Sequence, residues 1–143
     1  MRVKNLKLYR SSAGSGKTYT LALNYLAISL LGDQCGYQNY YKSILAITFT
    51  NKSAAEMKER ILDYLSILAN KKDKDNIVEW LVKETRLTET ELFNRAQKIH
   101  VHMLHNYSDL SISTIDKFTY GIARTFAKDL NLSNNFELEM DNY

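Results

Sequence analysis

The sequence SSAGSGKT at residues 11–18 has the residue types and the spacing of a phosphate-binding loop. Gly14 and Gly16 lack a Cβ atom, so the backbone can curl until successive N–H groups point into one anion-sized cavity. Lys17 then places a positive charge near the β- and γ-phosphates, and Thr18 offers a hydroxyl ligand to Mg²⁺. These residues predict a site for ATP and its Mg²⁺ ion.

The loop departs from the usual pattern G-x-x-x-x-G-K-[ST] at one position, where Ser11 replaces glycine. The flanking segments restore the expected context, because a strand-like segment at 3–9 precedes the loop and a helical pattern at 18–31 follows it. A helix that begins here directs the positive end of its dipole at the phosphates. The residues expected to hold the nucleotide are Ser12, Ala13, Gly14, Ser15, Gly16, Lys17 and Thr18, with Lys17 and Thr18 expected to act in catalysis.

The composition of the 143 residues predicts one soluble domain. A hydrophobic content of 45% is ample for a core, and the net charge of +3 is too small to identify a partner by itself. Cys35 is the single cysteine, so the chain has no internal disulfide, and this suits a reducing cytosol. The apolar stretch at 21–31 is too short to span a membrane. We therefore expect a cytoplasmic protein with no membrane partner.

Strand-like segments alternate with helical ones, which predicts an α/β fold with a parallel sheet and crossover helices. The strands are expected at 3–9, 43–50 and 109–113. The run SILAITFT at 43–50 is apolar and β-prone on both faces, which is typical of a buried central strand. Helices are expected at 18–31, 54–69, 76–84, 89–106 and 116–130, the second with Met57, Ile61, Tyr64, Leu65 and Leu68 on its apolar face.

Two helix starts have the spacing of a capping box, Ser53 with Glu56 and Thr88 with Glu91. Residues 70–106 are expected to form a small helical insert beside the sheet. Residues 131–143 alternate apolar and acidic side chains, and they predict either a short edge strand or an extended tail.

Three segments, taken together, resemble the first motif regions of superfamily 1 DNA helicases of the UvrD/RecB branch. They are SSAGSGKT, then ILAITFTNKSAAEMKERI at 44–61, then ISTIDKF at 112–118. The resemblance covers nearly the whole chain in the family's order. It implies that residues 1–143 are an N-terminal fragment of the first RecA-like motor domain, an incomplete P-loop NTPase fold. The implied activity is ATP-dependent translocation on single-stranded DNA and unwinding of the duplex in repair or recombination.

The resemblance also implies which residues meet DNA. Phe49 matches a position associated with base stacking, although a buried strand could equally place it in the core. Asp116 stands where many relatives have His, and its carboxylate would repel a phosphate. Arg60 matches the motif arginine, without an assigned role. The implied DNA-binding set is Phe49, Thr50, Asn51, Lys52, Thr114, Lys117 and Phe118. The expected partners are DNA, the remainder of the helicase chain with its second motor domain, and a nuclease domain or partner subunit.

The acidic strand motif of the family, of the kind D-E-x-Q-D, does not occur up to Tyr143. Phosphoryl transfer needs such a residue on Mg²⁺. We therefore expect this chain to bind ATP weakly, if at all, and not to hydrolyse it. Two other function classes remain open from the residues alone: a phosphate-loop kinase, and a nucleotide-dependent binding module without catalysis.

Two further clusters invite a functional interpretation. His100, His102 and His105 suggest metal ligands, but they do not share one side of a helix, so a helix surface is favoured. Tyr37, Tyr40 and Tyr41 could stack on bases, but such a cluster more often packs a loop against the core.

Overall fold

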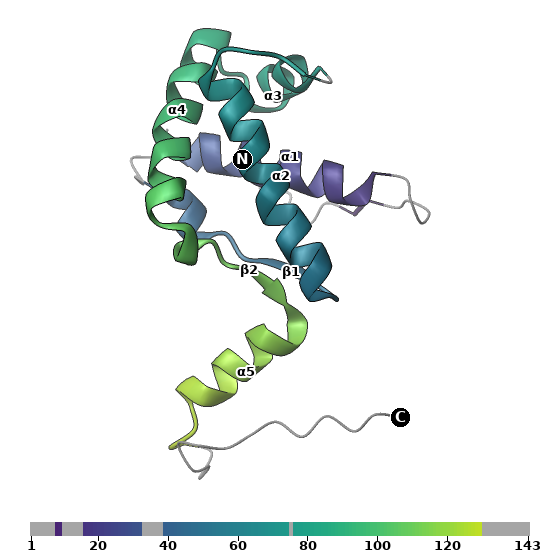
Figure 1. The fold of residues 1–143 in the computed structure, drawn as a ribbon, viewed down its shortest axis with the longest axis vertical. Coiled ribbons are helices and arrows are strands. Elements are labelled where there is room, and N and C mark those ends of the chain that lie inside the picture. Colours follow the sequence, from purple (N-terminus) through teal and green to yellow (C-terminus); the bar gives the residue numbers. More distant parts are fainter. Residues whose placement is uncertain (1–7, 10–15, 33–38, 75, 130–143) are drawn as a thin grey trace, which may run out of the picture.

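The structure is a computed structural model and describes residues 8–9, 16–32, 39–74 and 76–129. Five helices account for most of this part of the chain (Figure 1). They are α1 (Lys17–Gly32), α2 (Asn51–Ala69), α3 (Ile77–Thr85), α4 (Glu89–His105) and α5 (Ile115–Thr125), with strands β1 (Ala46–Thr48) and β2 (Ile112–Thr114) and the short 3-10 helices η2 (Tyr40–Ser43) and η3 (Tyr107–Asp109).

The two strands form a parallel pair in which Ala46 lies opposite Ile112 and Thr48 opposite Thr114. Both strands were expected from the sequence, as was their parallel direction. Each is shorter than the expected segment, and β2 ends one residue later than expected. Of the first expected strand, 3–9, only Leu8 and Tyr9 are described, and neither is in a strand. The fold is thus a mixed helix and strand arrangement with a small parallel sheet, and the wider sheet stays a prediction.

The prediction that 43–50 is buried on both faces is wrong within the described residues. Helix α2 covers one face of the strand pair, where Ile112 and Thr114 are buried. The other face is only partly covered, so Leu45 and Ile47 are 45% and 42% exposed and line a groove with residues of α1. An apolar run predicts a strand well, but it does not say how many of the strand's faces are covered.

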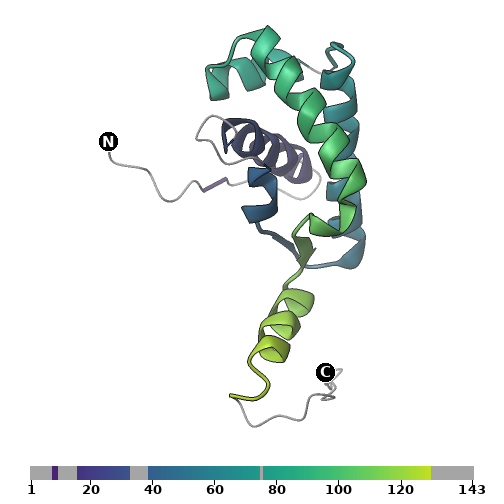
Figure 2. The same cartoon turned by 90° about the vertical axis from the view of Figure 1, so that its left-hand side faces the viewer.

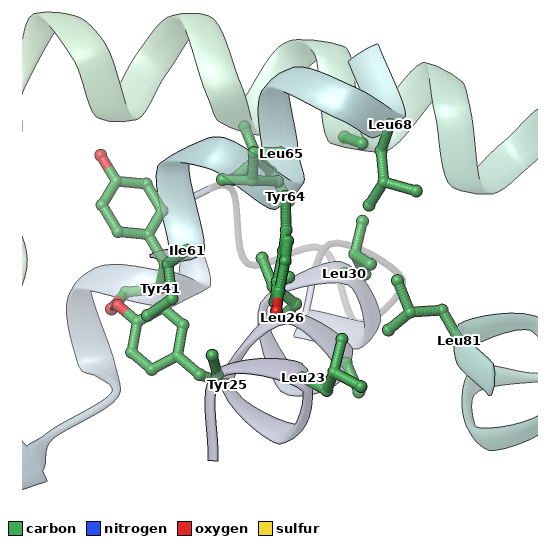
Figure 3. Close-up of a cluster of buried hydrophobic side chains, with 14 of the residues drawn as sticks. Leu23, Tyr25, Leu26, Leu30, Tyr41, Ile61, Tyr64, Leu65, Leu68 and Leu81 are labelled. Atoms are coloured by element: carbon green, nitrogen blue, oxygen red, sulfur yellow. Dashed lines mark hydrogen bonds between the residues drawn. The ribbon is translucent and has the colours of Figure 1, made fainter. Parts of the chain in front are cut away.

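The core lies among the helices rather than against the sheet. Helix α1 runs through its centre, and α2, α3 and α4 pack around it (Figures 1 and 2). The expected apolar face of α2 is confirmed, since all five of its predicted residues are buried. The described part of the helical insert packs on α1 and α2, and its place beside the wider sheet stays a prediction. Figure 3 shows the centre, with Leu23, Leu26 and Leu30 of α1 facing Ile61, Leu65 and Leu68 of α2 and Leu81 of α3.

Tyr41 ties the chain before β1 to the core. Its side chain is completely buried, and its hydroxyl is hydrogen-bonded to Nδ1 of His102 on α4 at 2.6 Å. The hydroxyl of Tyr25 donates to the Tyr41 carbonyl at 3.2 Å. Burial raises the pKa of the Tyr41 phenol. For Tyr41 the packing interpretation of the tyrosines is confirmed, whereas Tyr37 lies outside the described residues.

The helix caps are partly as expected. At α4 the capping box of Thr88 and Glu91 is present. At α2 the cap is Thr50, not Ser53 as expected, because the helix begins three residues earlier than its apolar pattern. Helix α5 begins and ends earlier than expected, none of its residues is buried, and it extends away from the other four helices in both views (Figures 1 and 2).

Candidate nucleotide and nucleic-acid site

The structure describes only the last three residues of the phosphate loop, 16–18. Gly16 has a φ of +79°, a backbone conformation that glycine adopts without strain, and its carbonyl accepts the Thr20 N–H at 2.9 Å. Lys17 is the first residue of α1 and is exposed, and Thr18 follows, half-buried. A helix N-terminus of this kind suits an anion. Residues 11–15 lie outside the described residues, so their role stays a prediction.

The segment after β1 presents Phe49 to solvent and then starts a helix. The Phe49 side chain is 89% exposed, so the interpretation as a core residue is wrong. Thr50 has extended backbone geometry, and its Oγ1 accepts the backbone N–H of Ser53 at 3.1 Å. Asn51 and Lys52 are exposed in the first turn of α2. This segment therefore offers an aromatic ring, an amide and an ammonium group beside a helix N-terminus.

The segment after β2 repeats this arrangement. Thr114 has extended backbone geometry, and its Oγ1 accepts the backbone N–H of Lys117 at 3.3 Å. The threonine is 4% exposed, so its hydroxyl acts as a cap and is turned away from solvent. Lys117 is exposed and Phe118 is half-buried. Asp116 is also exposed, so its carboxylate stands beside Lys117 at the same helix start.

The parallel pairing brings these two segments to one edge of the strand pair. Because Thr48 and Thr114 are register partners, the chain leaves both strands at the same end and both helices begin there. This meeting follows from the general rule that the carboxyl ends of parallel strands face one crevice. Residues 11–15 of the phosphate loop are not among the described residues.

A groove of about 400 Å³ runs from this edge along α2 and the outer side of β2, and we call it the α2–β2 groove. Asn51 and Lys117 of the predicted set both line it, which shows that the two segments contribute to one surface. Its lining also includes Ala54, Ala55 and Lys58 of α2, and Tyr107 of η3. No acidic side chain lines this groove among the described residues.

The opposite side of α2 has a different character. Tyr19, shortly after Lys17, lines a groove of about 420 Å³ together with Arg60 and the acidic residues Glu56, Glu59 and Asp63. The motif arginine therefore faces the α1 side of α2 and not the edge that carries Asn51. Helix α2 thus has its acidic residues together with Arg60 on the side toward α1, and Lys58 on the side toward β2.

The sequence did not single out Lys58 and Tyr107. Lys58 could have been found, because positions 51, 54, 55 and 58 follow the spacing of one helical stripe. Tyr107 had no such signal, since only tertiary packing brings η3 beside α2. The histidines form no metal site in the described part of the chain, where no group of three metal-ligating side chains occurs.

The parallel strand pair, the glycine and lysine at the start of α1, and the threonine caps of α2 and α5 are compatible with a fragment of a helicase motor domain. A family model for the UvrD/REP helicase N-terminal domain matches residues 4–142, and the chain belongs to this family. This membership favours the helicase interpretation over a phosphate-loop kinase and over a binding module.

Individual relatives agree with the family. The chain is 32% identical over 138 residues, 89% of its length, to RecBCD enzyme subunit RecB of Buchnera aphidicola subsp. Baizongia pistaciae. It is 33% identical over 134 residues, 94% of its length, to an ATP-dependent helicase/nuclease subunit of Lactobacillus johnsonii. It is 50% identical over 54 residues, 38% of its length, to ATP-dependent DNA helicase Rep of Escherichia coli.

The chain spans only 11%, 9% and 7% of the length of these three relatives, respectively. No solved structure matches it. In the part of the chain that the structure describes, no helix has both the length and the hydropathy of a membrane span.

Proposed function

We propose that residues 1–143 are the beginning of the first RecA-like motor domain of an ATP-dependent DNA helicase. The observation that carries this proposal is the common edge at which α2 and α5 begin, together with the family match over residues 4–142. The relatives are named as ATP-dependent helicases, one of them as a DNA helicase, which supports the same activity for the whole protein.

In this proposal the residues from Ser12 to Thr18 hold ATP, and the Thr18 hydroxyl contributes to Mg²⁺ binding. The start of α1 supports this assignment, because Gly16 has the positive φ of a phosphate loop and Lys17 is exposed. Bound Mg²⁺ neutralises charge on the β- and γ-phosphates. The residue that would hold Mg²⁺ from a neighbouring strand belongs to the remainder of the helicase chain, so this chain alone binds ATP weakly and does not turn it over.

Single-stranded DNA would lie across the edge formed by the starts of α2 and α5. Phe49 offers a ring for base stacking, and Lys52 and Lys117 offer charges for phosphates, the two contact types that single strands use. Thr50 and Thr114 act mainly as caps that fix the position of the segments, with Asn51 and Phe118 completing the surface. The relatives named RecB and helicase/nuclease support a nuclease domain or a partner subunit in the whole protein, and the single Cys35 suits the cytosol.

Two binding measurements on the chain test this function. A fluorescent ATP analogue should bind in the presence of Mg²⁺, and Lys17→Ala should abolish that binding while leaving DNA binding unchanged. A labelled oligothymidylate should bind, and the double variant Asn51→Ala with Lys117→Ala should weaken it while leaving nucleotide binding unchanged. Measurable ATP turnover by this chain alone, abolished by Lys17→Ala, would contradict the division of the catalytic site between this chain and the rest of the helicase.

A further inference from the structure

The α2–β2 groove continues beyond the residues that the family motifs identify. The end of the groove at the strand edge is formed by Asn51 and Lys117, and its other end is formed by Lys58 and Tyr107. Lys58 lies two helical turns after Asn51, which corresponds to about 10 Å along α2. A strand bound at the edge can therefore reach Lys58 without leaving the surface of this helix.

Lys58 and Tyr107 form a pair. The Lys58 Nζ atom lies 5.2 Å from the centre of the Tyr107 ring, within the range of a cation–π interaction. The Tyr107 ring is 47% exposed and Lys58 is half-buried, so both are accessible from solvent. The ring thus lies close to the lysine ammonium group at the groove that both residues line.

The charges that line the groove favour a polyanion. Lys58 and Lys117 line it, and the acidic residues of α2 that surround Arg60 line the opposite side of the helix. Asp116 is exposed next to Lys117 but is not among the residues that line the groove. Asp109 is the acidic residue closest in sequence to Tyr107, and it is paired with Lys42 at 2.7 Å. A phosphate backbone that leaves the strand edge along this groove thus meets positive charge.

We propose that Lys58, held in place by Tyr107, contacts a phosphate of the single strand and extends the DNA interface along α2 beyond the predicted set. This inference rests on the proposed function, because it assumes that the strand binds at the edge formed by Asn51 and Lys117. Lys58 is the contact, and Tyr107 is a positioning residue that acts through it.

The test uses the 143-residue chain and a fluorescein-labelled oligothymidylate, with binding followed by anisotropy between about 50 and 200 mM salt. Lys58→Ala should weaken binding roughly twofold to fivefold. It should also reduce the slope of log K against log salt by about 0.7, the value for one phosphate contact on a single strand. Lys58→Arg should keep both the affinity and the salt slope of the original chain. Lys83→Ala, which removes an exposed lysine on α3, should change neither the affinity nor the slope. Thermal unfolding establishes that each variant is folded.

Tyr107 is tested by a pair of variants in the same assay. Tyr107→Phe keeps the ring and should bind as the original chain does, while Tyr107→Leu should reproduce the weaker binding and the smaller salt slope of Lys58→Ala. If Lys117→Ala weakens binding but Lys58→Ala and Tyr107→Leu do not, the extension along α2 is overturned and the proposed edge remains. If the original chain does not bind the oligonucleotide, both the edge and its extension are overturned.

Discussion

Thr48 and Thr114 are register partners in the parallel strand pair, and this pairing sets where the two exposed helix starts lie. Thr114 is itself the cap of α5, whereas the cap of α2, Thr50, follows its strand by two residues. The two caps are thus offset along the strand direction. The offset leaves Phe49 outside the strand and free of the core, and it brings Asn51 into the same groove as Lys117.

Both caps should contribute to stability through their hydroxyl groups. Thr50→Ala and Thr114→Ala should each lower the free energy of unfolding by about 1 kcal/mol, because each removes an acceptor from a helical N–H. Urea unfolding followed by circular dichroism measures the loss. The matched variants Thr50→Ser and Thr114→Ser keep the oxygen and should lose much less. Equal losses for Ala and Ser would contradict a capping role and point to the lost methyl group instead.

Phe49→Ala should weaken DNA binding without changing the stability of the fold. The ring is 89% exposed, so its removal should change the free energy of unfolding by less than about 0.5 kcal/mol. It should weaken binding of an oligothymidylate about fivefold or more, since stacking of a base on an aromatic ring is worth roughly 1–3 kcal/mol. Phe126→Ala removes another exposed ring, just after α5, and should leave binding unchanged. A large loss of stability with unchanged binding would restore the core interpretation of Phe49.

Two glycines should respond to alanine in opposite directions. A Cβ atom on Gly32, the last residue of α1, would collide with the Tyr40 side chain. Gly32→Ala should therefore destabilise the protein by about 1–3 kcal/mol, because the segment before β1 has to move. Gly121 lies inside α5 with nothing close to its would-be Cβ, so Gly121→Ala should stabilise that helix by up to about 1 kcal/mol. Helical content and urea midpoints measure the effect of each substitution. If Gly32→Ala leaves the free energy of unfolding unchanged, the Tyr40 side chain shifts without cost.

The capping box of α4 should make the free energy of unfolding depend on pH in the acidic range. The Thr88 backbone N–H and hydroxyl both donate to Glu91, and these hydrogen bonds hold the pKa of Glu91 below its usual value of 4.5. A lowered pKa means that the stabilisation is present above about pH 4.5 and is lost as the pH falls through the folded-state value. In Glu91→Gln the urea midpoint should change less between neutral and acid pH than in the original chain. Glu89→Gln, in the same turn, controls for the helix dipole.

The helices could be predicted from the sequence because their packing faces repeat at helical spacing. The stripe from Met57 to Leu68 is buried as expected, and the Thr88–Glu91 box is present. The start of α2 was misplaced because Thr50 and Ser53 are both good caps. The choice depends on where β1 ends, and that is decided by its pairing with β2.

The parts of the candidate site that follow the ends of the strands could be predicted from the sequence. The parts that depend on packing between distant segments could not. The meeting of Asn51 and Lys117 follows from parallel strands, and it could be stated without coordinates. The exposure of Phe49 depends on whether the outer strand face is covered, which alternation of side chains does not reveal. The contact of Lys58 with Tyr107 joins α2 to η3, two segments whose local sequences contain no information about each other.

The strands β1 and β2 are neighbours in space, yet all of α2, α3 and α4 lies between them in the sequence. Joining them closes a long loop, and such non-local parallel pairings form slowly during folding. Helices α2 and α4 lie side by side, and their packing returns the chain to β1 (Figures 1 and 2). We therefore expect the edge with its two threonine caps to assemble after α2 and α4 have packed. A substitution in the α2–α4 interface should then affect that edge without touching any residue proposed to meet the ligand.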